Sequence, residues 1–302
     1  MAEHCVTRRH FMGGTASTAA ALGMSFAGLD RLNGLARQAV RPARPAVVTL
    51  VRDRGALTAS RSVDPAVLAR MLSDTVMHVT GERTARSGWL SLVKPTDVVG
   101  VVPTEHLNPT HPELFDAVHR SLVDAGVPAR NVVNANGGIE KARACTALIA
   151  LPALKARWLT GIGTVLKNYI LFSGRPSRYH DANKAGLGEI WNLPGVKGKT
   201  RLVLVDALRP LCDKGPQPDP RYLWDYDGLI AGVDPVAVET IALQIIVEKR
   251  RQIRGEMWPL SPPPLCVTAA DEVYGLGTSR RNEIKVNVVG WTESLLLDRT
   301  GD

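Results

Sequence analysis

The run Asp97-Val98-Val99-Gly100-Val101-Val102 is apolar after its first residue. A strand that lacks polar residues on both faces is typical of a sheet covered on both sides by helices. The same strand pattern is predicted for further short runs, at residues 46–51, 131–133, 146–151, 202–205, 229–231 and 283–289.

Between these runs the sequence has the periodicity of amphipathic helices. After Asp234-Pro235, which caps and opens a long helix, apolar residues recur at the spacing i, i+3, i+4 and i+7, namely Val238, Ile241, Ala242 and Ile245. Helices are also predicted after Asp64-Pro65, from Pro112 to Gly126, and over residues 183–191. Alternating strands and helices predict a layered α/β fold with a largely parallel sheet and helices on both faces.

The composition fits a folded chain. The 302 residues are 45% hydrophobic and 22% charged, which is enough apolar material for a core and argues against intrinsic disorder. No apolar run is long enough for a bilayer span, so a protein with several membrane spans is excluded.

The N-terminus has the pattern of a twin-arginine export signal. Thr7-Arg8-Arg9-His10-Phe11-Met12 precedes a weakly apolar segment of small residues at 13–29, and further arginines follow this segment. We therefore expect residues 1–36 to be a signal peptide, residues 37–45 a Pro/Arg-rich linker, and residues 46–302 one α/β domain. Cleavage after Ala36 and retention as an uncleaved anchor are both open at this point.

Export by this route makes the twin-arginine export machinery an expected partner, and it places the protein in the periplasm or on the outer face of the cytoplasmic membrane. Without residues 1–36 the chain has 34 basic and 27 acidic residues, a net charge of +7. The basic residues are scattered, so we expect no nucleic-acid partner.

The cysteines argue against a ferredoxin-like cluster. Besides Cys5 in the signal, the chain has Cys145, Cys212 and Cys266, without C-x-x-C spacing. In an oxidising compartment three thiols allow one disulfide, and the sequence does not indicate which pair would form it.

Residues 151–180 concentrate groups that suit an anionic ligand, although the same composition fits a solvated basic loop. Lys155, Lys167, Asn168 and Arg178 supply cationic and amide donors for a carboxylate, phosphate or sulfate. The spacing of a phosphate-binding P-loop is absent. Asp206 directly follows the apolar run 202–205, where parallel sheets commonly bind ligands.

From about residue 97 to residue 289 the chain resembles the family called domain of unknown function 362, in the twin-arginine exported form that lacks the ferredoxin-like cysteines. The segments that carry the resemblance lie at residues 97–101, 110–114, 154–155, 164–168, 180, 204–208, 215–216, 221–224, 234–238 and 274–277. Some similar proteins carry a ferredoxin-like segment, so the resemblance implies redox work or a cluster-bearing redox partner.

Two hypotheses follow. In the first, an exported enzyme binds an anionic small molecule with Lys155, Lys167 and Arg178, orients it with Asn168, and uses His180 with Asp206 for redox-linked or other proton transfer. In the second, the protein is a non-catalytic binder or a subunit of a periplasmic redox complex. Neither hypothesis specifies a cofactor. A metal site built from His111, His180, Asp206 or Asp234 ranks below both, because no paired-ligand spacing supports it.

Overall fold

A computed structural model describes residues 45–180 and 185–297, so the expected signal peptide and nearly all of the linker lie outside the described residues. All elements below belong to one compact unit of the chain, Arg44–Asp302. The strands lie in one mixed sheet with the order β3-β2-β4-β7-β8-β1-β9, and β5 pairs with both β7 and the short β6.

The strands of the sheet are β1 (Ala46–Arg52), β2 (Val99–Pro103), β3 (Val132–Asn134), β4 (Ala147–Leu151), β5 (Ala153–Arg157), β6 (Gly161–Ile162), β7 (Thr200–Leu211), β8 (Gly228–Gly232) and β9 (Ile284–Gly290). Only β8 and the two-residue β6 run against the others among the described strands. The prediction of a largely parallel α/β sheet is therefore confirmed.

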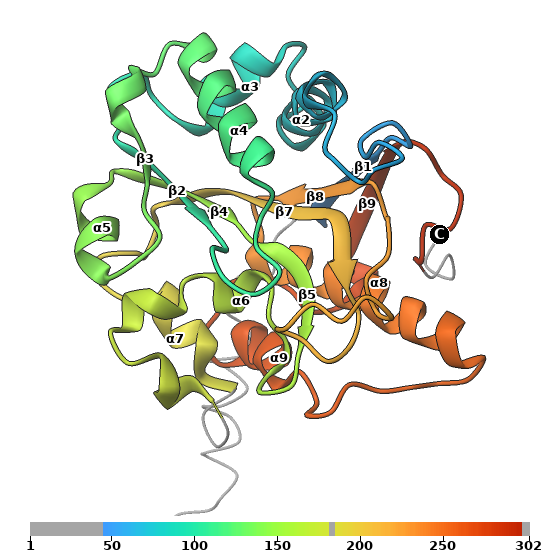
Figure 1. Cartoon of the computed structure of the whole chain (residues 1–302). Helices are drawn as coiled ribbons and strands as arrows, with labels where there is room; N and C mark the ends of the chain where they lie inside the picture. Colours follow the sequence, from blue (N-terminus) through green and yellow to red (C-terminus); the bar gives the residue numbers. More distant parts are fainter. Residues whose placement is uncertain (1–44, 181–184, 298–302) are drawn as a thin grey trace, which may run out of the picture. The chain divides into compact units, whose positions relative to one another are not determined.

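Helices cover both faces of the sheet (Figure 1). On one face lie α2 (Pro65–Thr80), α3 (Ala85–Leu92) and α4 (Pro112–Ala125). The other face carries α5 (Ile139–Ala144), α6 (Val165–Asn168), α7 (Gly188–Trp191), α8 (Pro235–Arg254) and α9 (Leu265–Glu272).

The strand sequences explain the two layers. Successive residues of β7 alternate between the two hydrophobic cores, with Leu202 and Leu204 in the core under α2 to α4, and Val203 and Val205 in the core under α5 to α9. Because side chains on a strand point alternately to opposite faces, a continuous apolar run fills both cores at once.

The predicted helix boundaries agree with the structure at three places. Asp64 and Asp234 accept hydrogen bonds from the first-turn amides of α2 and α8, so both act as N-caps. Gly126 ends α4 with a φ of 114°, a left-handed conformation that favours glycine. The helix predicted over residues 183–191 is shorter, since α7 spans only Gly188–Trp191 and residues 183 and 184 are not described.

The stretch from residue 151 to residue 168 is not a solvated loop. It forms β5, β6 and α6, and both Lys155 and Lys167 are buried within it.

Among the described residues no helix combines the length and the apolar character that crossing a bilayer requires. Cys145, Cys212 and Cys266 are buried thiols without a disulfide.

Candidate functional site

The buried carboxylate of Asp206 contacts the partly exposed ring of His111 at the point where β5 pairs with β7. One carboxylate oxygen of Asp206, Oδ2, accepts from the backbone N–H of His111 at 2.7 Å and lies 2.8 Å from its Nδ1. The other oxygen accepts from the backbone N–H of Leu208 at 3.1 Å. Burial lowers the pKa of His111, but the hydrogen bond and the charge of Asp206 outweigh it, so the net shift is upward. The sequence hypothesis paired Asp206 with His180, whereas the structure gives it His111.

The loop between β2 and α4 is held by Lys155. Nζ of Lys155 donates to the backbone carbonyls of His106 at 3.2 Å, Leu107 at 2.7 Å and Asn108 at 2.9 Å. An ammonium group has three N–H donors, so these carbonyls account for all of them. Burial, followed by the nearby charge of Arg157, lowers the pKa of Lys155 to about 7. Lys155 therefore adds positive charge near Arg157, and its hydrogen bonds hold the backbone of the loop at residues 106–108.

Lys167 lies in a different environment. Nζ is 2.8 Å from Nε2 of His180, which is its one hydrogen-bond partner in the described part of the chain. The residue is 8% exposed. Burial, followed by the charges of Arg157 and Lys155, lowers the pKa of Lys167 to about 7, and Cys266 opposes part of that shift. The structure thus brings Lys167 and His180 into contact, with Lys155 and Arg157 close enough to act on Lys167 electrostatically.

Arg157 on β5 and Asn168, which follows Lys167 in α6, carry buried polar atoms without a partner in the part of the chain that the structure describes. Nε of Arg157, and both Nδ2 and Oδ1 of Asn168, are buried without a hydrogen-bond partner among the described residues. Burial lowers the pKa of Arg157. A buried polar group without a partner costs about 1–3 kcal/mol, so orphaned donors in one region point to a ligand that would use them. We call Lys155, Arg157, Lys167, Asn168 and His180 the basic cluster.

Arg178 is placed differently from the other predicted ligand-binding residues. Its side chain is exposed and pairs with Glu189 at 3.6 Å, so its charge is already compensated. Arg209 likewise pairs with Asp225 at 3.4 Å.

The sequence analysis missed Glu239, a buried carboxyl in α8. Its Oε2 accepts from the backbone N–H of Leu166 at 2.6 Å, at the start of α6, and its Oε1 is buried without a partner among the described residues. Burial raises the pKa of Glu239 to about 8, while hydrogen bonds from the Leu166 and Val165 amides oppose the shift. Cys266 is near enough that Glu239 adds to the burial that raises the pKa of its thiol. In the sequence Glu239 directly follows the apolar Val238. A polar residue inside an apolar helix face is the one local sign that this carboxyl is buried.

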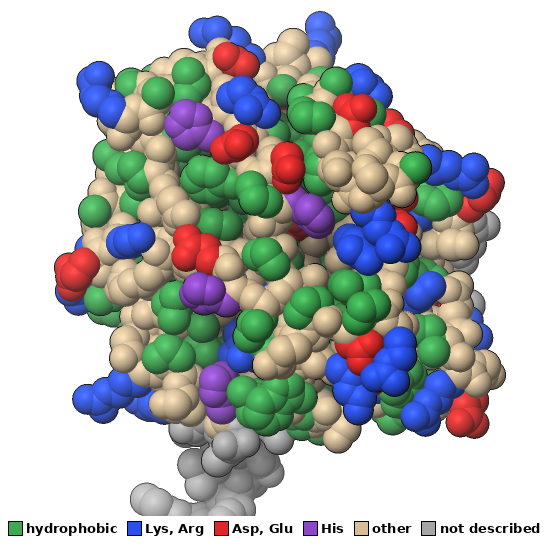
Figure 2. All heavy atoms as spheres, in the orientation of Figure 1, with side chains coloured by type: hydrophobic (Ala, Val, Ile, Leu, Met, Phe, Trp, Pro, Cys, Tyr) green, Lys and Arg blue, Asp and Glu red, His purple; other side chains and the backbone are tan. Residues whose placement is uncertain are grey.

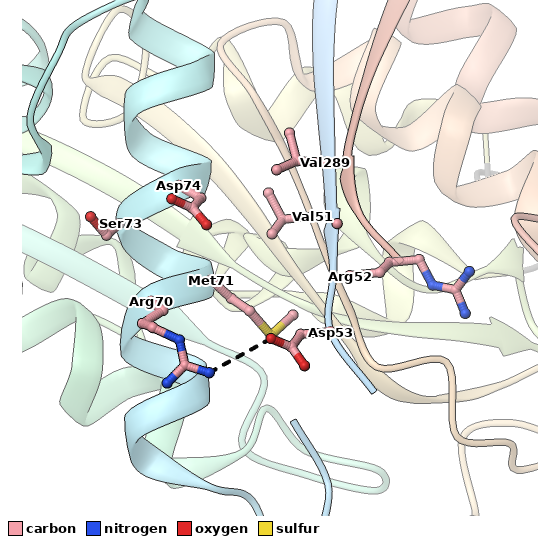
Figure 3. A pocket seen from close by; sticks show the side chains of 9 residues that line it. Val51, Arg52, Asp53, Arg70, Met71, Ser73, Asp74 and Val289 are labelled. Atoms are coloured by element: carbon pink, nitrogen blue, oxygen red, sulfur yellow. Dashed lines mark ion pairs between the residues drawn. The ribbon is translucent and has the colours of Figure 1, made fainter. Parts of the chain in front are cut away.

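Charged side chains elsewhere in the molecule lie in other surroundings than the basic cluster. Figure 2 shows one face of the molecule, on which basic side chains are interspersed with acidic, hydrophobic and histidine side chains. A pocket of about 220 Å³ lies elsewhere, between β1, β9 and α2, and contains the ion pair of Arg70 and Asp53 at 3.7 Å (Figure 3). The guanidinium of Arg52 points away from that pair and is stacked between Tyr226 and Trp291. These charges are paired or stacked, in contrast to those of the basic cluster.

Among residues 45–180 and 185–297, no group of three or more His, Cys, Asp or Glu side chains gathers as a metal site would require. His111 and Asp206 are in contact, Asp234 serves as the N-cap of α8, and His180 contacts Lys167.

Comparisons with known proteins identify the part of the chain that carries this site. No curated protein and no solved structure matches the chain. Residues 127–244, which include the whole basic cluster as well as Asp206 and Glu239, match the model of the family Domain of unknown function (DUF362).

Proposed function

We propose that this protein is exported and binds a small molecule carrying a carboxylate or phosphate group in the basic cluster. One observation carries the proposal: Lys155, Lys167 and Nε of Arg157 are buried, and no carboxylate side chain is bonded to any of these three residues among those described. Buried cations are normally paired, so a site of this kind favours an anionic guest.

The electrostatics support the same reading. Each lysine has a pKa of about 7 in the unliganded protein, since burial and neighbouring positive charge disfavour the ammonium form. A bound anion would reverse that effect, so binding is accompanied by proton uptake near neutral pH. The orphaned amide of Asn168 and Nε of Arg157 are suitable donors to the same anion.

The test is calorimetric titration of the full-length protein with inorganic phosphate and with a simple dicarboxylate at pH 6 and pH 8.5. We expect binding at pH 6, weaker binding at pH 8.5, and loss of at least tenfold in affinity in Lys167→Met. The matched control is Lys285→Met, which removes an exposed lysine on β9. Equal affinity in Lys167→Met and Lys285→Met would contradict the proposal.

Export by the twin-arginine route is a separate part of the proposal, supported by residues 7–12 and the segment of small residues that follows. Replacing Arg8 and Arg9 together by lysine should retain the protein in the cytoplasm, as measured by cell fractionation. A single replacement of Arg37 by lysine is the control. Unchanged export of the double variant would contradict the assignment.

The alternative is a non-catalytic binder or a subunit of a periplasmic redox complex. It predicts that replacing His180 or Asp206 changes ligand affinity and stability and no other measured property. Co-purification with a cluster-bearing protein from native periplasm would support the redox form of this alternative.

A further inference from the structure

We propose that Lys167 is a reactive amine that forms an imine with the carbonyl group of a 2-oxo acid. This inference rests on the proposed function, since the carboxylate of such a compound is the anion that the basic cluster would bind. It adds a covalent step and a substrate class to simple anion binding.

The contrast between the two buried lysines is the first argument. The ammonium of Lys155 is surrounded by three carbonyl oxygens, which suits a charged group that stays in place. Lys167 has neither a carbonyl nor a carboxylate as a hydrogen-bond partner in the described part of the chain, and its Nζ contacts an imidazole nitrogen. A neutral amine can donate one N–H to that nitrogen and keep its lone pair available.

The surroundings of Lys167 provide the second argument. Arg157 and Lys155 place positive charge near Nζ, Cys266 favours the ammonium, and His180 is in contact. Desolvation together with a neighbouring cation is how lysines that react with carbonyl compounds are activated. The pKa of about 7 agrees with this arrangement.

The third argument is access. Lys167 is 8% exposed and His180 is partly buried, whereas Glu239 is 0% exposed, so this pair lies nearer to solvent than the buried carboxyl. A bound carboxylate would accept hydrogen bonds from Nε of Arg157 and Nδ2 of Asn168, which have no other partner among the described residues.

The chemistry balances without an oxidant or reductant. The lone pair of Nζ forms a bond to the carbonyl carbon, and the π electrons move to oxygen. Nε2 of His180 accepts one proton from nitrogen and passes it to that oxygen, which gives a carbinolamine. A second proton from nitrogen takes the same route as the C–O bond breaks, so that amine and ketone yield imine and one water. His180 is therefore the proton carrier for both halves of the step.

The test is reductive trapping. Full-length protein is treated at pH 7 with limiting pyruvate and sodium cyanoborohydride, and modified peptides are quantified by mass spectrometry. A lysine with a pKa near 7 is about half neutral at this pH, whereas an ordinary one is neutral in fewer than about one molecule in a thousand. We expect modification at Lys167 at least tenfold above that at Lys285, abolished in Lys167→Arg, reduced in His180→Gln, and retained in Lys285→Arg.

Controls separate this inference from the proposed function. Circular dichroism establishes that each variant is folded, and inorganic phosphate, which has no carbonyl group, reports anion binding alone. Phosphate binding without preferential labelling of Lys167 would overturn the imine and leave anion binding intact. Absence of both would overturn both. Equal labelling by pyruvate and by uncharged acetone would overturn the assignment to 2-oxo acids, since the site would then not use the carboxylate.

Discussion

Asp206 binds His111 through both its backbone nitrogen and its Nδ1, so one carboxylate oxygen fixes the start of α4 and the orientation of an imidazole. The side chain of Asp206 is 1% exposed and that of His111 is 26% exposed. The aspartate is thus a buried anchor, and the ring keeps an edge toward solvent.

Replacing Asp206 by asparagine should lower the pKa of His111, since the largest effects that raise it are the hydrogen bond and the charge of this carboxylate. Titration of the histidine ring protons by NMR measures the change, with His78 on α2 as an internal control. A His111 that titrates identically in the variant would show that the bond does not form.

The same pair gives stability a defined pH dependence. The pKa of His111 is raised above its ordinary value of 6.5, so the stabilisation is fully present below pH 6.5 and is lost as pH rises through the folded-state value. His111→Asn should therefore lose more free energy of unfolding at pH 5.5 than at pH 9, measured by urea denaturation. An equal loss at both pH values would contradict the interpretation.

Lys155→Met should destabilise the protein by about 2–4 kcal/mol, because three loop carbonyls lose their donor while the apolar stem is kept. Urea denaturation at pH 6.5 measures this loss, and limited proteolysis should show cleavage within residues 104–111. The control Lys285→Met should stay within about 0.5 kcal/mol of the wild-type protein. A stable, protease-resistant Lys155→Met variant would show that the loop does not depend on the ammonium.

Glu239→Gln should flatten the pH profile of stability. The folded carboxyl has a pKa of about 8 against an ordinary 4.5, so wild-type protein loses stability as pH rises between these values, while the unfolded chain has already released the proton. The variant should resemble the wild-type protein at pH 5 and be the more stable of the two at pH 9. Glu272→Gln, on an exposed position of α9, is the control and should follow the wild-type profile.

Gly100→Ala tests the packing of β2. A Cβ at residue 100 would lie 2.6 Å from Sγ of Cys145 and 2.8 Å from Cβ of Ala135, so neighbouring groups must move. We expect a loss of about 1–3 kcal/mol in the free energy of unfolding. Gly138→Ala, whose added carbon would meet nothing within 4 Å, is the control.

The strand runs and the helix caps were predictable, because burial on both faces and N-capping leave local signals in the sequence. Asp234 caps α8 as its pattern indicated, and residues 202–205 form a strand as predicted. That strand continues to Leu211, however, so Asp206 lies within β7 and not at a strand end as the sequence had indicated. The antiparallel direction of β8 was not predictable, since an apolar run has the same composition in either direction.

The site was predictable only as a set of residue types. Lys155, Lys167 and Asn168 were identified by composition, but their partners depend on contacts across the fold. The carbonyls of residues 106–108 belong to a loop nearly fifty positions away from Lys155, and Glu239 reaches Leu166 from 73 positions away. No local sequence pattern indicates such pairings. For this reason His180 was predicted to transfer protons, and His111 was considered only as a possible metal ligand.

The pairing of β1 with β9 has a consequence for how the chain is made. Ala46 in the first strand of the described chain aligns with Ile284 in the last, so a ribosome-bound chain cannot complete this edge of the sheet until residues 284–290 have been synthesised. Until then Val48, Leu50 and their neighbours offer unsatisfied backbone groups on a strand rich in branched side chains, which is the kind of edge that recruits other chains. Products truncated before residue 284 should therefore aggregate more than the full chain during synthesis, because β1 and not β9 would then be the edge strand of the sheet.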